Sequence, residues 1–238
     1  MVDLPDLVGH PAYPSTMERL VASNGGTVLD AARAALERDD AALFAVERPR
    51  LLAPILPTAL RSADPEPAER PVVGPDDLAP WPSGAGWLEL RPRIAAVLRR
   101  PVEGALAREE VPGWVFGYTL LGDLLIHPRS GGPEPTLRGS PVALGPAVVT
   151  PDEVDPQTSY VIVRVDGREW AKGNLNGAAR TLLAQVAAAS REERLEAGEA
   201  FASAPFELDR FGERLWPGAE IEIEAEGLGV LRFRLGRP

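Results

Sequence analysis

The fold of this chain is best predicted outward from residues 87–98, which read Trp87-Leu88-Glu89-Leu90-Arg91-Pro92-Arg93-Ile94-Ala95-Ala96-Val97-Leu98. This stretch predicts a strand that runs into the core, because it ends in an unbroken apolar run. Side chains two apart on a strand share a face, so Glu89, Arg91 and Arg93 are expected together. Guanidinium groups at the edge of a core need acidic partners or an anionic ligand, because an unpaired buried charge is costly.

Further strands are expected downstream, where apolar runs alternate with Gly/Pro turns. The expected strands are 88–98, 115–121, 147–149, 160–165, 221–226 and 230–235. Residues 221–226 alternate between apolar residues and Glu, which predicts one buried and one solvated face. Strands dominate and no strand–helix unit repeats. The predicted fold class is therefore α+β and β-rich, with few helices, rather than doubly wound.

The domain organisation follows from the change in pattern along the chain. We predict a small N-terminal helical and extended segment over residues 1–50, with a helix at 27–46, and one larger domain over residues 51–238. A second helix is expected at 176–189. Residues 62–83 are rich in Pro, Asp and Glu and have little to bury, so they predict a mobile loop.

Composition excludes several classes of function. The formal net charge of −10 argues against nucleic acid, whose phosphates favour basic surfaces. The chain has no cysteine and hence no disulfide or thiolate metal site. No apolar run approaches the roughly 20 residues of a membrane span. The N-terminus lacks the basic start and apolar core of a signal peptide, so we expect a cytoplasmic protein.

Several segments, in order, resemble motifs of one known family. They are Leu51-Leu52-Ala53-Pro54, Val115–Thr119 with Asp123, Leu144–Val154, Val163–Glu169 with Gly173-Asn174, and Trp216–Glu220 with Glu224–Leu231. Together they are similar to the fumarylacetoacetate hydrolase (FAH) family in its short, single-catalytic-domain form, over roughly residues 51 to 235. The resemblance implies a β-roll-like fold, usually a dimer, and cleavage, decarboxylation or tautomerisation of small 2-oxo or diketo acids at bound Mg²⁺ or Mn²⁺.

The resemblance also identifies where the family's metal ligands would fall. Family members hold the metal with a Glu-x-Glu pair on one strand and an Asp, for which Asp123 fits. The pair aligns with Arg91-Pro92-Arg93, where two guanidinium groups replace two carboxylates. Because hard cations prefer oxygen ligands, we expect no metal ion here. Asp123 is then the only retained ligand position, and Glu89 is one further candidate ligand.

Other catalytic positions of the family also depart from its pattern. Its catalytic His and Glu would fall within residues 58–69, which contain no His, and its Lys would fall near Arg138. A guanidinium keeps the charge of that Lys but does not deprotonate. His127 is a candidate general base, although a loop position is favoured. His127 and Arg138 are the catalytic candidates, and Tyr118 joins Arg91, Arg93 and Asp123 as a ligand-binding candidate.

Alternatives remain open at this stage. For Arg91, Arg93 and Asp123, a salt-bridge cluster is favoured over a site that grips a carboxylate, and contacts with Asp123 or Glu89 are expected. The chain is then either a binding or assembly homologue, as a homodimer or a heteromer with an active paralogue, or a metal-independent enzyme on a small carboxylate-bearing ligand. The alternative is an ordinary Mg- or Mn-dependent hydrolase or decarboxylase with relocated ligands, which ranks lowest because several residue classes depart together.

Overall fold

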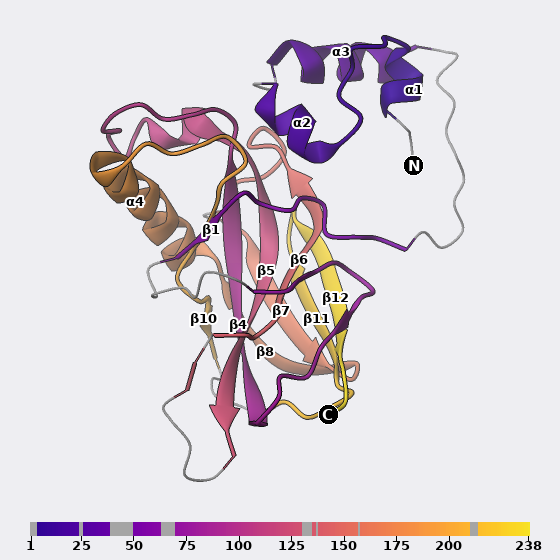
Figure 1. Cartoon of the computed structure of the whole chain (residues 1–238), viewed down its shortest axis with the longest axis vertical. Helices are drawn as coiled ribbons and strands as arrows, with labels where there is room; N and C mark the ends of the chain where they lie inside the picture. The colour runs from indigo at the N-terminus through magenta and orange to yellow at the C-terminus, as the bar shows by residue number, and fades with distance from the viewer. Residues whose placement is uncertain are drawn as a thin grey trace.

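Strands build most of the body of this protein. The computed structural model describes residues 4–23, 26–38, 50–62, 70–129, 135–136, 138–156, 158–209 and 214–238. In this part of the chain, one six-stranded sheet has the order β1 (Leu60–Arg61), β9 (Ala200–Ala202), β4 (Ala85–Leu98), β5 (Val115–Pro128), β6 (Val142–Val149), β2 (Val72–Val73). The other has the order β10 (Glu207–Leu208), β8 (Arg168–Asn174), β7 (Tyr160–Val165), β11 (Glu220–Ala225), β12 (Gly229–Leu235), β3 (Leu78–Ala79). The result is the expected β-rich α+β fold, a curled, roll-like body (Figure 1).

The two longest strands, β4 and β5, form the centre of the first sheet. They pair antiparallel along almost their whole length, with Arg91 opposite Asp123. The strand predicted at 88–98 is thus confirmed and begins at Ala85. The strand predicted at 115–121 is too short, because β5 continues through Gly122 and Asp123, residues that strands disfavour, to Pro128.

The main core lies between the two sheets. Leu120 and Leu124 of β5 belong to one buried cluster with Ile223 of β11 and Phe233 of β12. Gly122 permits β5 to approach β12 closely, since a Cβ atom at this position would lie 2.9 Å from the ring of Phe233. The strand predicted at 221–226 is confirmed as β11, whose apolar residues are buried.

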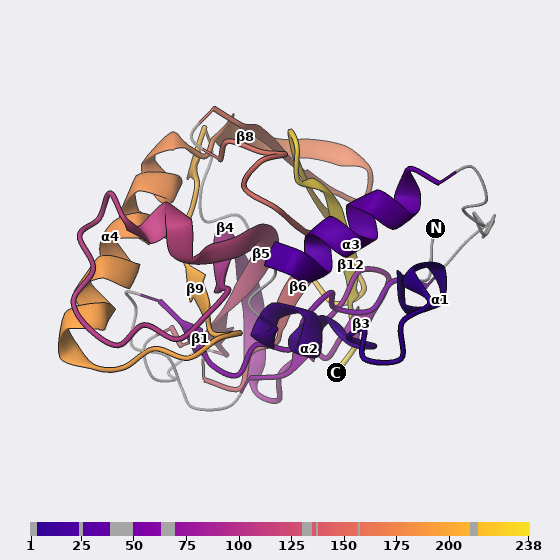
Figure 2. The ribbon, with the colours of Figure 1, turned by 90° about the horizontal axis from the view of Figure 1, so that it is seen from above.

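Helices cover one end and one side of this body. Figure 2 shows α4 (Asn176–Glu192) along one side, with α1 (Leu4–Val8), α2 (Met17–Ala22) and α3 (Gly26–Leu36) gathered at another. A short 3₁₀ helix, η1 (Val111–Trp114), precedes β5. The helix predicted at 27–46 ends at Leu36, and residues 39–46 lie outside the described residues. No described helix is both long and apolar enough to span a membrane. The domain boundary at residue 50 stays a prediction.

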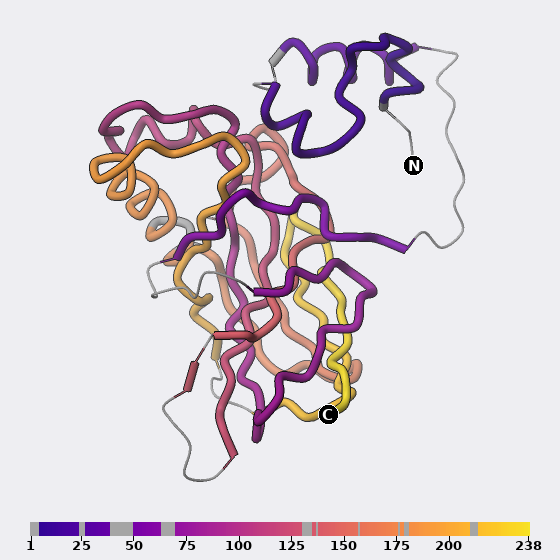
Figure 3. Tube along the Cα trace, viewed as in Figure 1, coloured from indigo at the N-terminus to yellow at the C-terminus, as the bar shows by residue number. Residues whose placement is uncertain are grey.

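The segment expected to be a loop with little to bury is largely structured. Residues 63–69 lie outside the described part, but β2 and β3 place residues 72–73 and 78–79 in the two sheets. Val73 and Ala79 are buried. Figure 3 shows residues 50–62 and 70–79 running across the body before the chain enters β4. The two short strands anchor this segment to the sheets, although Leu78 stays 62% exposed. The mobility expected of residues 62–83 remains a prediction.

Candidate functional site: a buried arginine–aspartate cluster

One face of the β4–β5 pair gathers the candidate residues. Because paired residues of antiparallel strands point to the same side, the register puts Arg91 beside Asp123 and Trp87 beside His127. This face lies opposite the one that packs against the second sheet. Its apolar part is a separate small cluster that includes Leu121, and the extended segment before β1 covers it through Ala53. The strand alternation predicted from residues 87–98 thus places the charged side chains together.

Asp123 lies between two guanidinium groups and is 1% exposed. One carboxylate oxygen, Oδ1, accepts a hydrogen bond from Arg70 Nη2, and the other, Oδ2, lies 3.2 Å from Arg93 Nε. The side chains of Arg93 and Arg70 are 1% and 4% exposed. We call Arg70, Asp123 and Arg93 the buried cluster. Its formal charge is +1, since two guanidinium groups surround one carboxylate.

Main-chain carbonyl groups also contact both arginines. Arg93 Nη1 donates to the carbonyl oxygen of Ser203, 2.8 Å away. Arg70 Nε donates to the carbonyl oxygen of Ser140 at 3.2 Å, and its Nη2 donates to the Ser140 hydroxyl at 2.9 Å. Carbonyl dipoles partly offset the excess positive charge of the cluster. Ser203 is fully buried, and its carbonyl serves this purpose.

Arg91 is separated from the buried cluster although it stands opposite Asp123. Its Nε lies 3.2 Å from Glu89 Oε1, and its side chain is 31% exposed. The expected contacts of Arg91 or Arg93 with Asp123 or Glu89 are therefore confirmed. Arg91 and Arg93 nevertheless have different surroundings, because Arg93 is buried in an ion-pair cluster while Arg91 reaches the surface.

His127 occupies the end of β5 and is not the loop residue that was favoured. Its Nε2 lies 2.9 Å from Glu89 Oε2, and its ring stacks on Trp87 with centroids 3.5 Å apart and planes 10° from parallel. The guanidinium of Arg214 lies 5.2 Å from the Trp87 ring centre on the same indole. His127 lies in the strand because β5 extends to Pro128, which pairs His127 with Trp87 of β4. Glu89 thus joins Arg91 to His127.

Tyr118 does not belong with the other ligand-binding candidates. It lies on the opposite face of β5, in the core between the sheets, and is 5% exposed. Burial, followed by the negative charge of Asp155, raises the pKa of its phenol above the usual value. A side chain on this face does not reach a ligand held beside Asp123.

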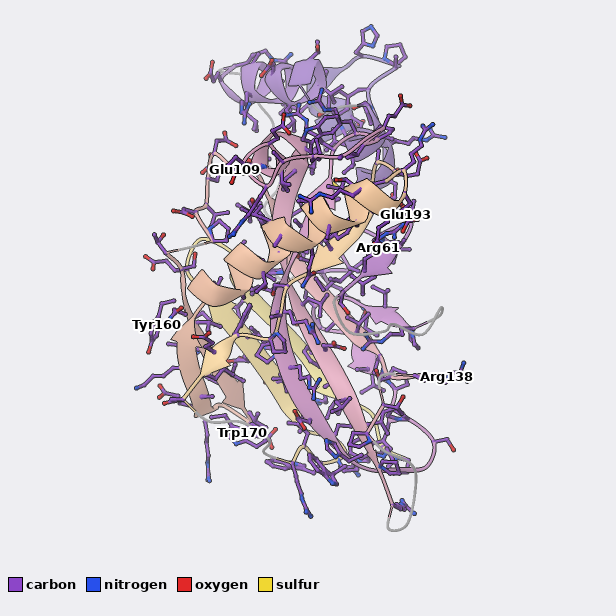
Figure 4. All side chains as sticks on the ribbon, turned by 90° about the vertical axis from the view of Figure 1, so that its left-hand side faces the viewer. Arg61, Glu109, Arg138, Tyr160, Trp170 and Glu193 are labelled. Atoms are coloured by element: carbon purple, nitrogen blue, oxygen red, sulfur yellow. The ribbon has the colours of Figure 1, made fainter. Side chains whose placement is uncertain are left out.

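Arg138 is likewise apart from the cluster. It is exposed, and its backbone N–H donates to the Thr136 hydroxyl at 3.1 Å. Figure 4 shows its side chain pointing away from the body. Arg70 is the residue that sequence reasoning missed. It follows the acidic, Pro-rich stretch, and no periodic pattern signals that it folds back onto a strand far along the chain.

The donor set does not match a divalent cation in the part of the chain that the structure describes. Both oxygens of Asp123 face guanidinium groups, and Glu89 is shared by Arg91 and His127. Among the described residues, no group of three or more His, Asp or Glu side chains is arranged to hold a metal ion. Mg²⁺ and Mn²⁺ prefer several carboxylate or carbonyl oxygens and water, which this arrangement does not offer.

Comparison with known proteins places this geometry in context. A family model described as fumarylacetoacetate (FAA) hydrolase C-terminal matches residues 68–236. The structure is similar to maleylpyruvate hydrolase from Sphingobium sp. SYK-6 in complex with manganese(II) ion and pyruvate, with a TM-score of 0.75, 22% identity, and coverage of 99% of this chain and 92% of that one. Fumarylacetoacetate hydrolase from the psychrophilic Exiguobacterium antarcticum is similar with a TM-score of 0.75 and 22% identity. The match covers 100% of this chain and 92% of that one. For 5-carboxymethyl-2-hydroxymuconate delta-isomerase from Mycobacterium smegmatis the TM-score is 0.65 and the identity 21%. The match covers 79% of this chain and 82% of that one. No curated protein sequence matches.

Proposed function

Because the chain belongs to the fumarylacetoacetate (FAA) hydrolase C-terminal family, we propose that it is a metal-independent member, in which the buried cluster takes the place of a bound cation. The observation that carries this proposal is the position of Asp123, whose two oxygens face Arg70 and Arg93. A divalent ion among three carboxylates would leave a net charge of −1, whereas the buried cluster carries +1. A cation entering this site would meet two guanidinium groups already placed at Asp123, which supports a function other than metal-dependent hydrolysis.

The proposed activity is binding of a small carboxylate-bearing molecule of the 2-oxo or diketo acid type. Arg91 is suited to this, because it lies on the face of Asp123 and its side chain is 31% exposed. Guanidinium groups bind carboxylates through paired hydrogen bonds. The manganese and pyruvate bound to the maleylpyruvate hydrolase support a ligand of this class. We also propose that the protein is cytoplasmic and works as a homodimer, or as a heteromer with an active paralogue.

A second candidate function is metal-independent proton transfer on the same ligand. The observation in its favour is the contact between His127 and Glu89, because a carboxylate that holds an imidazole is a common arrangement for a general base. Arg91 contacts the same Glu89. A carboxylate bound by Arg91 would then lie near a residue that can move a proton.

Calorimetric titration with Mn²⁺ and Mg²⁺ tests the proposal directly. We expect no binding to the wild-type protein. Binding at about micromolar Kd, which corresponds to roughly −8 kcal/mol, would overturn it and favour a metal-dependent hydrolase or decarboxylase with relocated ligands. Arg91→Glu with Arg93→Glu restores the pair of carboxylates and is expected to gain metal affinity if the double variant remains folded by circular dichroism.

A thermal-shift screen with pyruvate and longer 2-oxo acids tests the ligand. Stabilisation that Arg91→Ala abolishes supports the binding site, and Arg138→Ala is the matched control on an exposed arginine outside the buried cluster. Deuterium exchange at the carbon next to the carbonyl, measured with EDTA present, separates the two candidates. Exchange that His127→Gln removes supports proton transfer, whereas ligand stabilisation without exchange supports a binding homologue. No stabilisation by any of these acids would contradict the ligand class.

A further inference from the structure

A separate cavity lies near the start of β5, at the opposite end of this strand from His127. Its volume is about 190 Å³, and its walls come from η1, β5, α4 and the connection between β6 and β7. Figure 2 shows α4 along this side of the body, where it contacts η1. None of the lining residues belongs to the buried cluster or to the Glu89–His127 pair. A ligand in this cavity is therefore independent of one held by Arg91.

Three prolines and two aliphatic side chains form the apolar walls of the cavity. Pro112 belongs to η1, Pro151 and Pro156 belong to the connection after β6, and Val154 and Leu183 are the aliphatic residues. Proline has a fixed φ angle and no backbone N–H, so these walls are stiff and offer few hydrogen-bond donors. An anion, which needs donors, would be poorly held here. A cavity of roughly 150 Å³ accepts benzene, so this one has room for a six-membered ring.

Tyr118 and Asp155 are the polar residues of the lining. Tyr118 is 5% exposed, whereas Asp155 is exposed. Burial, followed by the charge of Asp155, raises the pKa of the Tyr118 phenol, so the hydroxyl is neutral at pH 7 and its oxygen lies within the field of this carboxylate. A neutral hydroxyl has two acceptor lone pairs, so it accepts a hydrogen bond from a ligand even while it donates one elsewhere. The same negative field that opposes a phenolate attracts a cation.

The position of Asp155 is fixed by its main chain. Its carbonyl oxygen accepts hydrogen bonds from the hydroxyl groups of Thr158 and Ser159, at 3.1 and 3.2 Å. The carboxylate acts on a cation in the cavity through its charge, and this attraction operates across several ångströms without a direct contact. The net charge of −10 on the whole chain adds a long-range attraction of the same sign. The cavity thus combines apolar walls, one hydroxyl acceptor and a negative field.

We propose that this cavity is a second ligand site, which binds a small primary ammonium ion with a ring-sized apolar body. The ammonium group donates a hydrogen bond to the Tyr118 hydroxyl oxygen and is attracted by the charge of Asp155. The apolar body packs on the three prolines, Val154 and Leu183. Because the bound cation contacts η1, β5 and α4 together, it strengthens the attachment of α4 to the first sheet.

Calorimetry with cyclohexylammonium on the full chain at pH 7 tests this site. We expect saturable one-to-one binding with a Kd of about one millimolar or tighter. Cyclohexanol has the same ring without the charge and is expected to bind at least about tenfold more weakly, because hydrogen bonds to charged groups are the stronger ones. Cyclohexanecarboxylate, which reverses the charge, is expected to show no binding.

Two conservative variants locate the bound cation. Tyr118→Phe removes only the hydroxyl and is expected to weaken cyclohexylammonium binding by about tenfold. Asp155→Asn keeps the shape of the side chain and removes its charge. A loss of at least about threefold is expected, smaller because this exposed charge is partly screened. Glu153→Gln is the matched control, since it removes an exposed carboxylate of the same connection that does not line the cavity, and is expected to change binding by less than about twofold.

Three results would overturn the proposal. They are no binding of cyclohexylammonium to the wild type at about 10 mM, equal binding of cyclohexanol, and unchanged binding in Tyr118→Phe. Melting curves without ligand check that each variant is folded, which the small size of these substitutions favours. Arg91→Ala is expected to leave cyclohexylammonium binding unchanged, so failure here and failure of the proposed function are distinguishable.

Discussion

Arginine–carboxylate pairs occur in two contrasting regions of this protein. In the buried cluster, Asp123 and Arg93 are each 1% exposed. On the outer face of the second sheet, the side chains of cross-strand pairs of the same chemistry are 14% to 62% exposed. We call this set the outer ladder, and it consists of Arg234–Glu220 at 2.9 Å, Arg232–Glu222 at 2.5 Å and Arg164–Glu224 at 2.5 Å. From this difference we infer that burial, rather than the distance between the charged atoms, determines how an ion pair affects the stability of the fold.

Desolvation explains this difference. Moving ions out of water costs several kcal/mol for each, so the buried cluster contributes little net stability but cannot be broken singly. In the outer ladder, each pair keeps at least one well-exposed ion, so forming or losing a pair changes the free energy of unfolding little. The buried cluster therefore selects one arrangement of β4, β5 and the segment at Arg70. The outer ladder keeps a charged, soluble surface on β11 and β12.

The largest expected effect is the loss of Asp123. Asp123→Ala leaves Arg70 and Arg93 buried without their shared carboxylate and is expected to destabilise the fold by about 3–5 kcal/mol. Glu220→Ala, which removes a carboxylate of the outer ladder, is expected to cost less than about 1 kcal/mol. Urea unfolding followed by circular dichroism measures both. Equal, small costs would mean that water reaches the cluster and would remove the contrast.

Coupling energies sharpen the same comparison. A double-mutant cycle with Arg93→Met and Asp123→Asn is expected to give a coupling of about 2 kcal/mol, because the two side chains contact each other away from water. The corresponding cycle with Arg234→Met and Glu220→Gln is expected to give about 0.5 kcal/mol or less. Free energies of unfolding of the wild type, single and double variants supply both values. A larger coupling in the outer ladder would contradict our account of burial.

How far the sequence predicts this contrast depends on strand length and on long-range contacts. Alternation over residues 221–226 predicts the outer ladder's face, and residues 87–98 predict the shared face of Arg91 and Arg93. Tyr118 was misplaced because the strand expected at 115–121 stopped before Asp123. Because β5 is one continuous strand, the odd number of positions from Tyr118 to Asp123 puts the two side chains on opposite faces. Arg70 had no signal, because its contact with Asp123 depends on how a non-periodic segment folds across the sheet.

Salt is expected to weaken the outer ladder and leave the buried cluster intact. Screening shortens the reach of exposed charges from about 10 Å at 0.1 M salt to about 3 Å at 1 M. The cost of Glu220→Ala should therefore fall toward zero in 1 M NaCl, whereas that of Asp123→Ala should change little. Urea unfolding at the two salt concentrations checks this. A parallel decrease for both variants would show that the two regions have the same access to solvent.

Asp77 belongs to a third ion pair, with the smallest expected effect. Its carboxylate is 19% exposed and lies 2.7 Å from Arg50, whose side chain is 72% exposed. Burial alone would raise its pKa, but the hydrogen bond from Arg50, the Gly74 N–H and the Arg50 charge outweigh burial and hold the pKa below 3.8. The folded state therefore gains stability from Asp77 above pH about 4, near the pKa of an unfolded Asp, and loses this gain as the pH falls through the lower, folded pKa. The stability difference between the wild type and Asp77→Asn, measured by urea unfolding, should be under about 1 kcal/mol at pH 7 and should shrink below pH 4. A difference that grows toward acid pH would reverse the sign and show that burial dominates at this position.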